Sequence, residues 1–134
     1  MADLSLTPAQ VAPCYSDRAE IVNHVAGADL TAGDAVTFNA TGAVIQADAN
    51  DAAANTFRGI ALQTVKSGQP VAVLYRGHVY GFAVSGLNAN VAVYVSDTVA
   101  KLADTASVTK TLVAGYVVAL SDKTKVLFID GFAS

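Results

Sequence analysis

Two histidines are the side chains in this sequence best suited to acid–base or metal chemistry. His24 and His78 begin similar segments, His-Val-Ala-Gly and His-Val-Tyr-Gly. Imidazole titrates near neutral pH and is a common zinc ligand. No Cys or Glu lies at zinc-ligand spacing from either histidine, and their matching contexts favour an inherited structural role. We therefore expect no catalytic residue and no metal site at the histidines.

The carboxylates offer little more chemistry. Glu20 is the only glutamate, and most of the aspartates lie in turns, where Asp usually bonds its own backbone. The chain therefore shows no carboxylate pair suited to glycoside hydrolysis. Asp48-Ala-Asn50-Asp51 is a weak version of the alternating oxygens that bind calcium. We expect no bound metal and no cofactor.

Nucleophiles and phosphate loops are also lacking. Cys14, the only cysteine, stands between Pro13 and Tyr15 without a neighbouring base, and it excludes an internal disulfide. There is no Gly-x-Ser-x-Gly elbow and no glycine-rich phosphate loop. A biotinyl or lipoyl carrier domain remains an alternative, because Lys66 and Lys123 lie near predicted hairpins, although neither has the carrier signature. The sequence predicts a protein that is not an enzyme.

Charge and hydropathy limit the partners. The net charge is −3, and the eight Lys and Arg residues are scattered, so we expect no nucleic acid partner. Hydrophobic residues reach 53% while charged residues are only 14%, yet no apolar run is long enough for a membrane helix. A surface so poor in charge suits a subunit covered by partners. The N-terminus lacks the pattern of a secretory signal, which predicts synthesis in a cytoplasm.

The elements that would position these residues are short strands separated by turns. No amphipathic helix of useful length is evident. About eight strands at this spacing predict an all-β fold, a small β-barrel or β-sandwich. The expected strands are Ala19–Val25, Ala35–Asn39, Ala43–Ala47, Gly59–Lys66, Val71–Phe82, Val91–Ser96, Thr111–Leu120 and Lys125–Ile129.

Internal similarity predicts a duplication. Five pairs of segments keep their order at spacings of 53 to 57 residues, among them Leu30–Phe38 with Leu87–Val95 and Gly59–Ala61 with Gly115–Val117. Neither half can bury both faces of its own sheet, so the halves are expected to pack together. We expect one β domain over residues 19–134, built from quasi-repeats at about 20–75 and 76–130.

Residues 1–18 differ from the rest of the chain. Pro8 suits the start of a helical turn, and Pro13 prevents that turn from continuing. We expect an extended N-terminal arm that crosses a partner, with a disordered terminus as the alternative. The arm residues expected to bind the partner are Leu4, Leu6, Val11 and Tyr15.

A second candidate contact surface lies on the longest predicted strand. Alternation places Arg76, His78 and Tyr80 on one face of that strand. An ordinary solvated face and a polar contact surface both fit this pattern. We keep these three residues as candidate partner-binding residues.

Several short motifs between residues 19 and 130 carry a family likeness. They are Ala28-Asp-Leu-Thr-Ala-Gly-Asp-Ala-Val36, Ala47-Asp-Ala-Asn50, Arg58-Gly-Ile-Ala-Leu62, Ser67-Gly-Gln-Pro-Val71, Ala92-Val-Tyr-Val-Ser-Asp97 and Ala114-Gly-Tyr-Val-Val-Ala119. Together they resemble the decoration, or cement, proteins of tailed-bacteriophage capsids. The resemblance implies a β-rich structural protein on the virion exterior, made in the host bacterial cytoplasm. Its implied partners are the major capsid protein and itself, as a homo-oligomer with a trimer favoured.

This resemblance leads to specific expectations. The protein would stabilise contacts between major capsid protein subunits, and deleting residues 1–15 would leave a folded domain that no longer binds capsids. The alternative is a head-fibre or tail-associated β domain that binds host surface glycans. That alternative calls for exposed aromatic platforms, whereas the Tyr and Phe residues mostly fall within predicted strands.

Overall fold

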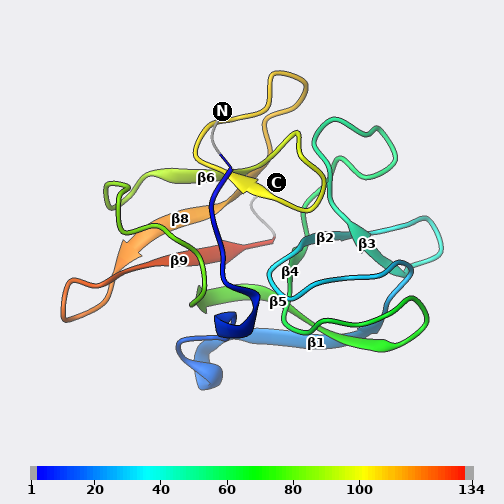
Figure 1. Ribbon diagram of the computed structural model, residues 1–134, viewed down its shortest axis with the longest axis horizontal. Coiled ribbons are helices and arrows are strands. Elements are labelled where there is room, and N and C mark those ends of the chain that lie inside the picture. The colour runs from blue at the N-terminus through cyan, green and yellow to red at the C-terminus, as the bar shows by residue number, and fades with distance from the viewer. Residues whose placement is uncertain (1–2, 132–134) are drawn as a thin grey trace.

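The fold is an antiparallel sheet of nine strands that curls into a half-barrel (Figure 1). The computed structural model describes residues 3–131, apart from the side chain of Ser16. This range contains no α-helix, only the 3-10 turns η1 (Pro8–Gln10) and η2 (Ser16–Arg18). The all-β prediction is therefore confirmed. The strands are β1 (Glu20–Val25), β2 (Ala35–Phe38), β3 (Val44–Gln46), β4 (Gly59–Ala61), β5 (Pro70–Val79), β6 (Ala92–Val95), β7 (Leu102–Ala103), β8 (Val113–Ala119) and β9 (Lys125–Asp130).

The order of the strands repeats in the two halves of the sheet. Along the sheet the order is β3-β2-β4-β5-β9-β8-β6-β7, so each half reads the same way outward from the β5–β9 contact. In this arrangement β2, β3, β4 and β5 correspond to β6, β7, β8 and β9. The topology thus agrees with the quasi-repeats expected from the sequence.

Matching glycines mark the two halves as copies. A Cβ atom added to Gly59 in β4 would collide with the carbonyl oxygen of Leu74, and one added to Gly115 in β8 would collide with that of Phe128. Glycine is needed where two backbones approach this closely. The sequence match between Gly59 and Gly115 therefore reflects the same packing constraint, imposed once in each half.

One large cluster of buried side chains is shared by both halves. It includes Ile60 and Leu74 from the first half and Val117 and Leu127 from the second, all fully buried. A smaller cluster around Leu30 and other residues lies within the first half. Because the larger cluster takes strands from both repeats, neither repeat buries its apolar side chains without the other.

The N-terminal arm is extended, as predicted, and it lies along the chain's own β domain. In Figure 1 its dark blue trace runs from the neighbourhood of β7 past the end of β5. The Leu4 amide donates to Leu102, the Thr7 amide to Gly81, and the Cys14 amide to His78. Backbone hydrogen bonds therefore fix the arm at three places along the second half.

Three strand predictions were wrong in detail. The strand expected over Val71–Phe82 ends at Val79, just before Gly81 takes a positive φ of +101°. The strand expected over Gly59–Lys66 ends at Ala61, and Val65 instead bridges to Leu30. The short strand β7 was missed. Two residues are too few for an alternating pattern to be read from sequence.

Candidate functional site

A row of aromatic rings crosses the second half of the sheet. His78 in β5 lies directly opposite Phe128 in β9, and Phe128 lies opposite Tyr116 in β8. Paired residues of antiparallel strands direct their side chains to the same face. The intervening residues Val117 and Leu127 are fully buried on the core side, so the row lies on the outer face. We call this surface the aromatic face, formed by Tyr15, His78, Tyr80, Tyr116 and Phe128.

The N-terminal arm extends the row by one more ring. The Cys14 amide bonds to the carbonyl of His78, which fixes the arm beside β5. The Tyr15 ring then meets the His78 ring edge-on, with 5.4 Å between centroids and 86° between planes. On its other side, His78 contacts Phe128 at 5.1 Å. The strands and the arm together hold the rings at fixed positions.

Exposure differs along the aromatic face. Tyr15, Tyr80 and Tyr116 are 37%, 45% and 43% exposed, whereas His78 and Phe128 are intermediate. Aromatic rings that are held rigidly and partly exposed combine apolar area with hydroxyl groups able to hydrogen-bond. This composition is typical of the central part of protein–protein interfaces.

Charged groups lie at the borders of the aromatic face. The Arg18 guanidinium lies 5.6 Å from the centroid of the Tyr15 ring. Arg76 lies opposite Asp130 in the sheet, and its Nε is 3.4 Å from a carboxylate oxygen of that residue. Arg76 is thus engaged within the chain, although its side chain remains 46% exposed.

Three titratable groups on or beside the face, His78, Cys14 and Tyr80, have pKa values shifted toward their neutral forms. Burial, with a further contribution from the Arg18 charge, lowers the pKa of His78. Burial raises the pKa of Cys14, although its hydrogen bond with Tyr80 acts in the opposite direction. The charge interaction with Cys14 is the main cause that raises the pKa of Tyr80. At neutral pH these groups are uncharged, which suits a contact surface.

Four of the residues selected from the sequence come together here. Tyr15, Arg76, His78 and Tyr80 all lie on or beside the aromatic face. The sequence interpretation missed Tyr116 and Phe128, which complete the row. Alternation within β8 and β9 was the available signal that these two rings lie on the outer face. The register that brings them beside His78 does not follow from one sequence.

The other three selected residues lie elsewhere and point inward. Leu4 and Val11 are buried and belong to the shared core cluster, and Leu6 packs against it. Their expected role of filling a partner's pockets therefore requires the arm to leave its own domain. In this conformation they bind the arm to the sheet instead.

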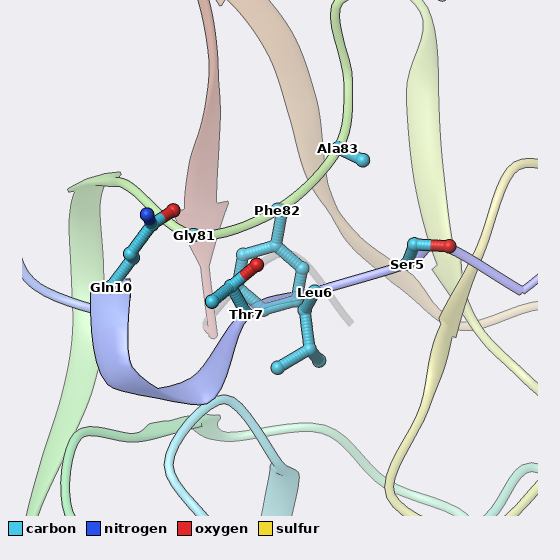
Figure 2. Close-up of a pocket in the computed structure, with 7 residues that line it drawn as sticks. All are labelled: Ser5, Leu6, Thr7, Gln10, Gly81, Phe82 and Ala83. Carbon is cyan, nitrogen blue, oxygen red and sulfur yellow. The ribbon is translucent and has the colours of Figure 1, made fainter.

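A small open pocket of about 220 Å³ lies beside Leu6. Figure 2 shows the Leu6 and Phe82 side chains between the arm and the segment that follows β5. The pocket is below the roughly 300 Å³ typical of small-molecule sites. It is lined by Ser5, Leu6, Thr7, Gln10, Gly81, Phe82 and Ala83.

The other histidine has a separate aromatic environment. His24 in β1 stacks on Tyr75 at 5.6 Å, hydrogen-bonds its hydroxyl, and meets Phe38 at 4.9 Å. Within residues 3–131, no group of three or more His, Cys, Asp or Glu side chains is arranged to hold a metal ion. Nor does any helix in the described range have the length and apolar character to cross a membrane.

A comparison of the chain with protein-family models, curated proteins and solved structures finds no match.

Proposed function

We propose that this protein is a structural virion component that binds the outer surface of a tailed-phage capsid. In this role it stabilises contacts between subunits of the major capsid protein and associates with further copies of itself. It is made in the cytoplasm of the bacterial host and acts on the capsid exterior. It performs no catalysis.

The observation that carries this proposal is the aromatic face. A surface that presents Tyr15 from the arm, Tyr80 after β5 and Tyr116 from β8 fits a protein partner better than a small substrate, since the rings form a row rather than the wall of a cavity. The low charge of the chain and the resemblance of its sequence motifs to capsid decoration proteins point the same way.

The mechanism is binding alone. A protein that binds only the expanded capsid stabilises that state by mass action. A homo-oligomer that engages several capsid subunits at once gains further from multivalency. Neither effect requires a reactive group.

Capsid stability tests this proposal. Empty expanded capsids of the phage that encodes the chain are heated with and without the purified protein, and their disruption is followed by light scattering. We expect disruption at a higher temperature when the protein is present at saturation. An unchanged temperature at saturating protein would contradict the proposed role.

A second candidate function is glycan binding by a head-fibre or tail-associated domain. The exposed rings of Tyr80 and Tyr116 favour it, because flat aromatic surfaces also contact sugar rings. A glycan array separates the two functions. Saturable binding of a host surface glycan without capsid binding would establish the second candidate in place of the first.

A further inference from the structure

We propose that the N-terminal arm exchanges between copies of this chain, so that the arm of one copy completes the second half of the sheet in another. The exchanging stretch is residues 3–15, which the structure shows against the chain's own domain. We call the place it occupies, between β7 and the segment Val79–Ala83, the arm slot. The inference rests on the self-association included in the proposed function and identifies the surface that carries it.

The arm supplies a strand position that the second half does not fill with its own residues. In the first half, Ala26 bridges Val44 of β3, and the Gly27 amide donates to the Val44 carbonyl. The residues that match Ala26 and Gly27 in the repeat are Tyr80 and Gly81, and both bond to the arm. The β7 strand, the counterpart of β3, also bonds to the arm. The end of the chain therefore fills a place that the first half closes internally.

Backbone hydrogen bonds hold the arm on both sides of the arm slot. They run from the Leu4 amide to Leu102, from the Thr7 amide to Gly81, from the Ala83 amide to Ser5 and from the Tyr80 amide to Ala12, with N···O distances of 2.8 to 2.9 Å. Figure 2 shows Leu6 and Phe82 together where the two segments meet. Strand addition of this kind depends on main-chain groups, which an arm from any copy carries.

The side-chain fit makes the arm of a second copy the occupant. Gly33 and Gly81 have φ angles of +94° and +101°, which glycine adopts readily. A Cβ added to Gly33 would lie 2.9 Å from Leu6 Cδ1, and one added to Gly81 would lie 2.8 Å from Val11 Cγ2. The arm slot is thus shaped to the apolar side chains of this sequence. A second copy presents the same side chains at the same spacing, so its arm fits equally well.

The hinge for exchange is the 3-10 turn η2 (Ser16–Arg18). Asp17 and Arg18 are exposed, and the Arg18 amide bonds back to the Tyr15 carbonyl. Exchange opens this turn and gives up that hydrogen bond, while the contacts between arm and slot stay the same. Because both forms share those contacts, the hinge and the protein concentration decide between them.

Exchange makes each aromatic face a product of two copies. The Cys14 amide bonds to the His78 carbonyl, and the Tyr15 ring meets the His78 ring, so Tyr15 moves with the arm. The face then takes Tyr15 from one copy and His78 and Tyr116 from another. The assembly closes as a reciprocal pair, or as a ring in which each copy passes its arm to the next. Neighbouring copies on a capsid favour exchange through their high local concentration.

Disulfide trapping between two different chains tests the exchange. Ser5 and Ala83 are exposed, and the Ala83 amide donates to the Ser5 carbonyl. Residues paired in this way have Cα atoms about 5.5 Å apart, within the range that a disulfide spans. One chain carries Ser5→Cys and the other Ala83→Cys, both in a Cys14→Ser background. An arm seated in the slot of the other chain brings these two thiols together.

The two chains are mixed at high concentration, warmed to allow exchange and then oxidised. One chain is isotopically labelled, so that mass spectrometry identifies the mixed disulfide. The matched control replaces Ala83→Cys with Val108→Cys, since Val108 is 97% exposed and lies outside the arm slot. We expect the disulfide between positions 5 and 83 in roughly tenfold excess over the control, as the effective concentration of a seated arm requires. A yield no higher than that of the control would overturn the inference.

The length of the hinge provides an independent test. Deletion of Asp17 and Arg18 hinders the arm from reaching its own slot, whereas insertion of Gly-Ser-Gly-Ser after Asp17 eases that return. Sedimentation velocity should show stronger association for the deletion and weaker association for the insertion than for wild type. Circular dichroism melting establishes that each variant is folded. Equal association of both variants would also overturn the inference. These measurements use no capsid, so their failure leaves the proposed capsid binding to its own test.

Discussion

Gly33 and Asn90 occupy equivalent positions in the two halves and share an unusual backbone conformation. Their φ angles are +94° and +74°, and their amides donate to Ala61 and Val117, which are also equivalent. Each residue turns the chain just before a matching strand, β2 or β6. The duplication therefore preserves a left-handed turn even where the glycine of one half is an asparagine in the other.

This equivalence predicts opposite effects of two substitutions. Asn90→Gly should be neutral or stabilise the fold by up to about 1 kcal/mol, because glycine accepts a positive φ more readily. Gly33→Ala should destabilise it by about 2 kcal/mol, through backbone strain and crowding. The new Cβ would lie 2.9 Å from Leu6 Cδ1. Chemical unfolding of both variants measures the difference, and equal effects at the two positions would contradict the structural equivalence.

The buried arm residues make the arm part of the stable domain. Leu4→Ala should lower the free energy of unfolding by about 2 kcal/mol, the lower end of the range for buried leucine. Val11→Ala should cost more than about 1 kcal/mol. Val99→Ala is the matched control for Val11, because Val99 is 47% exposed and should change little.

The same packing alters the expectation for a truncated chain. The sequence predicted that removal of residues 1–15 leaves a folded domain. Because Leu4 and Val11 belong to the shared core, we now expect this truncation to melt well below the full chain. Identical melting of the truncated and full-length chains would show that the arm contributes nothing to the fold.

The lowered pKa of His78 predicts a loss of stability on acidification. Burial, and then the Arg18 charge, holds this pKa below the ordinary value of 6.5, so the unfolded chain binds the proton more readily. The stability that neutral His78 contributes to the fold is complete above pH 6.5. It is lost as the pH falls through the pKa that His78 has in the folded state. His78→Gln should therefore flatten the dependence of unfolding free energy on pH between about 7 and 5.

Asp29→Asn is the control for this titration. The Ser67 backbone amide, and then Lys66, lowers the pKa of Asp29 below its ordinary value of 3.8, so that carboxyl titrates outside the window. Its removal should leave the slope between those pH values unchanged. If the unfolding free energy of His78→Gln depends on pH as steeply as that of wild type, groups other than His78 cause the loss of stability in acid.

Cys14 should react slowly, because burial raises its thiol pKa and less of the reactive thiolate is present. The hydrogen bond with Tyr80 lowers that pKa, so Tyr80→Phe should slow alkylation further at a fixed pH. Rates measured in denaturant provide the control and should agree for the two proteins. Faster alkylation of folded Tyr80→Phe would show that the ring shields the thiol rather than stabilising the thiolate.

The sequence predicted those features that depend on local pattern. Turn residues and alternation located most strands, and the matched segments anticipated the symmetrical strand order. Arg76 and His78 follow from period-two alternation along β5, and Tyr80 follows directly after that strand. Alternation holds over Arg76–Val79, although β5 shifts register against β1 near Tyr75, and this local pattern located part of the aromatic face correctly.

The remaining features depend on contacts between distant segments. Tyr116 joins His78 only through the register of three strands, which a slip of one residue would destroy. The packing of Leu6 and Val11 against the domain depends on Gly33 and Gly81, where absent side chains leave room for the arm. Their spacing in the sequence fits a partner's pockets equally well, so pattern alone did not separate the two cases.

Co-sedimentation with empty expanded capsids tests the central claim most directly. The comparison uses wild type, Tyr116→Ala on the aromatic face, and Val108→Ala as an exposed control. Tyr116→Ala should change stability by less than about 1 kcal/mol, since its ring is 43% exposed. We predict saturable binding of wild type and Val108→Ala, and at least a tenfold loss of affinity for Tyr116→Ala. No capsid binding by wild type, or equal binding by all three proteins, would contradict the account.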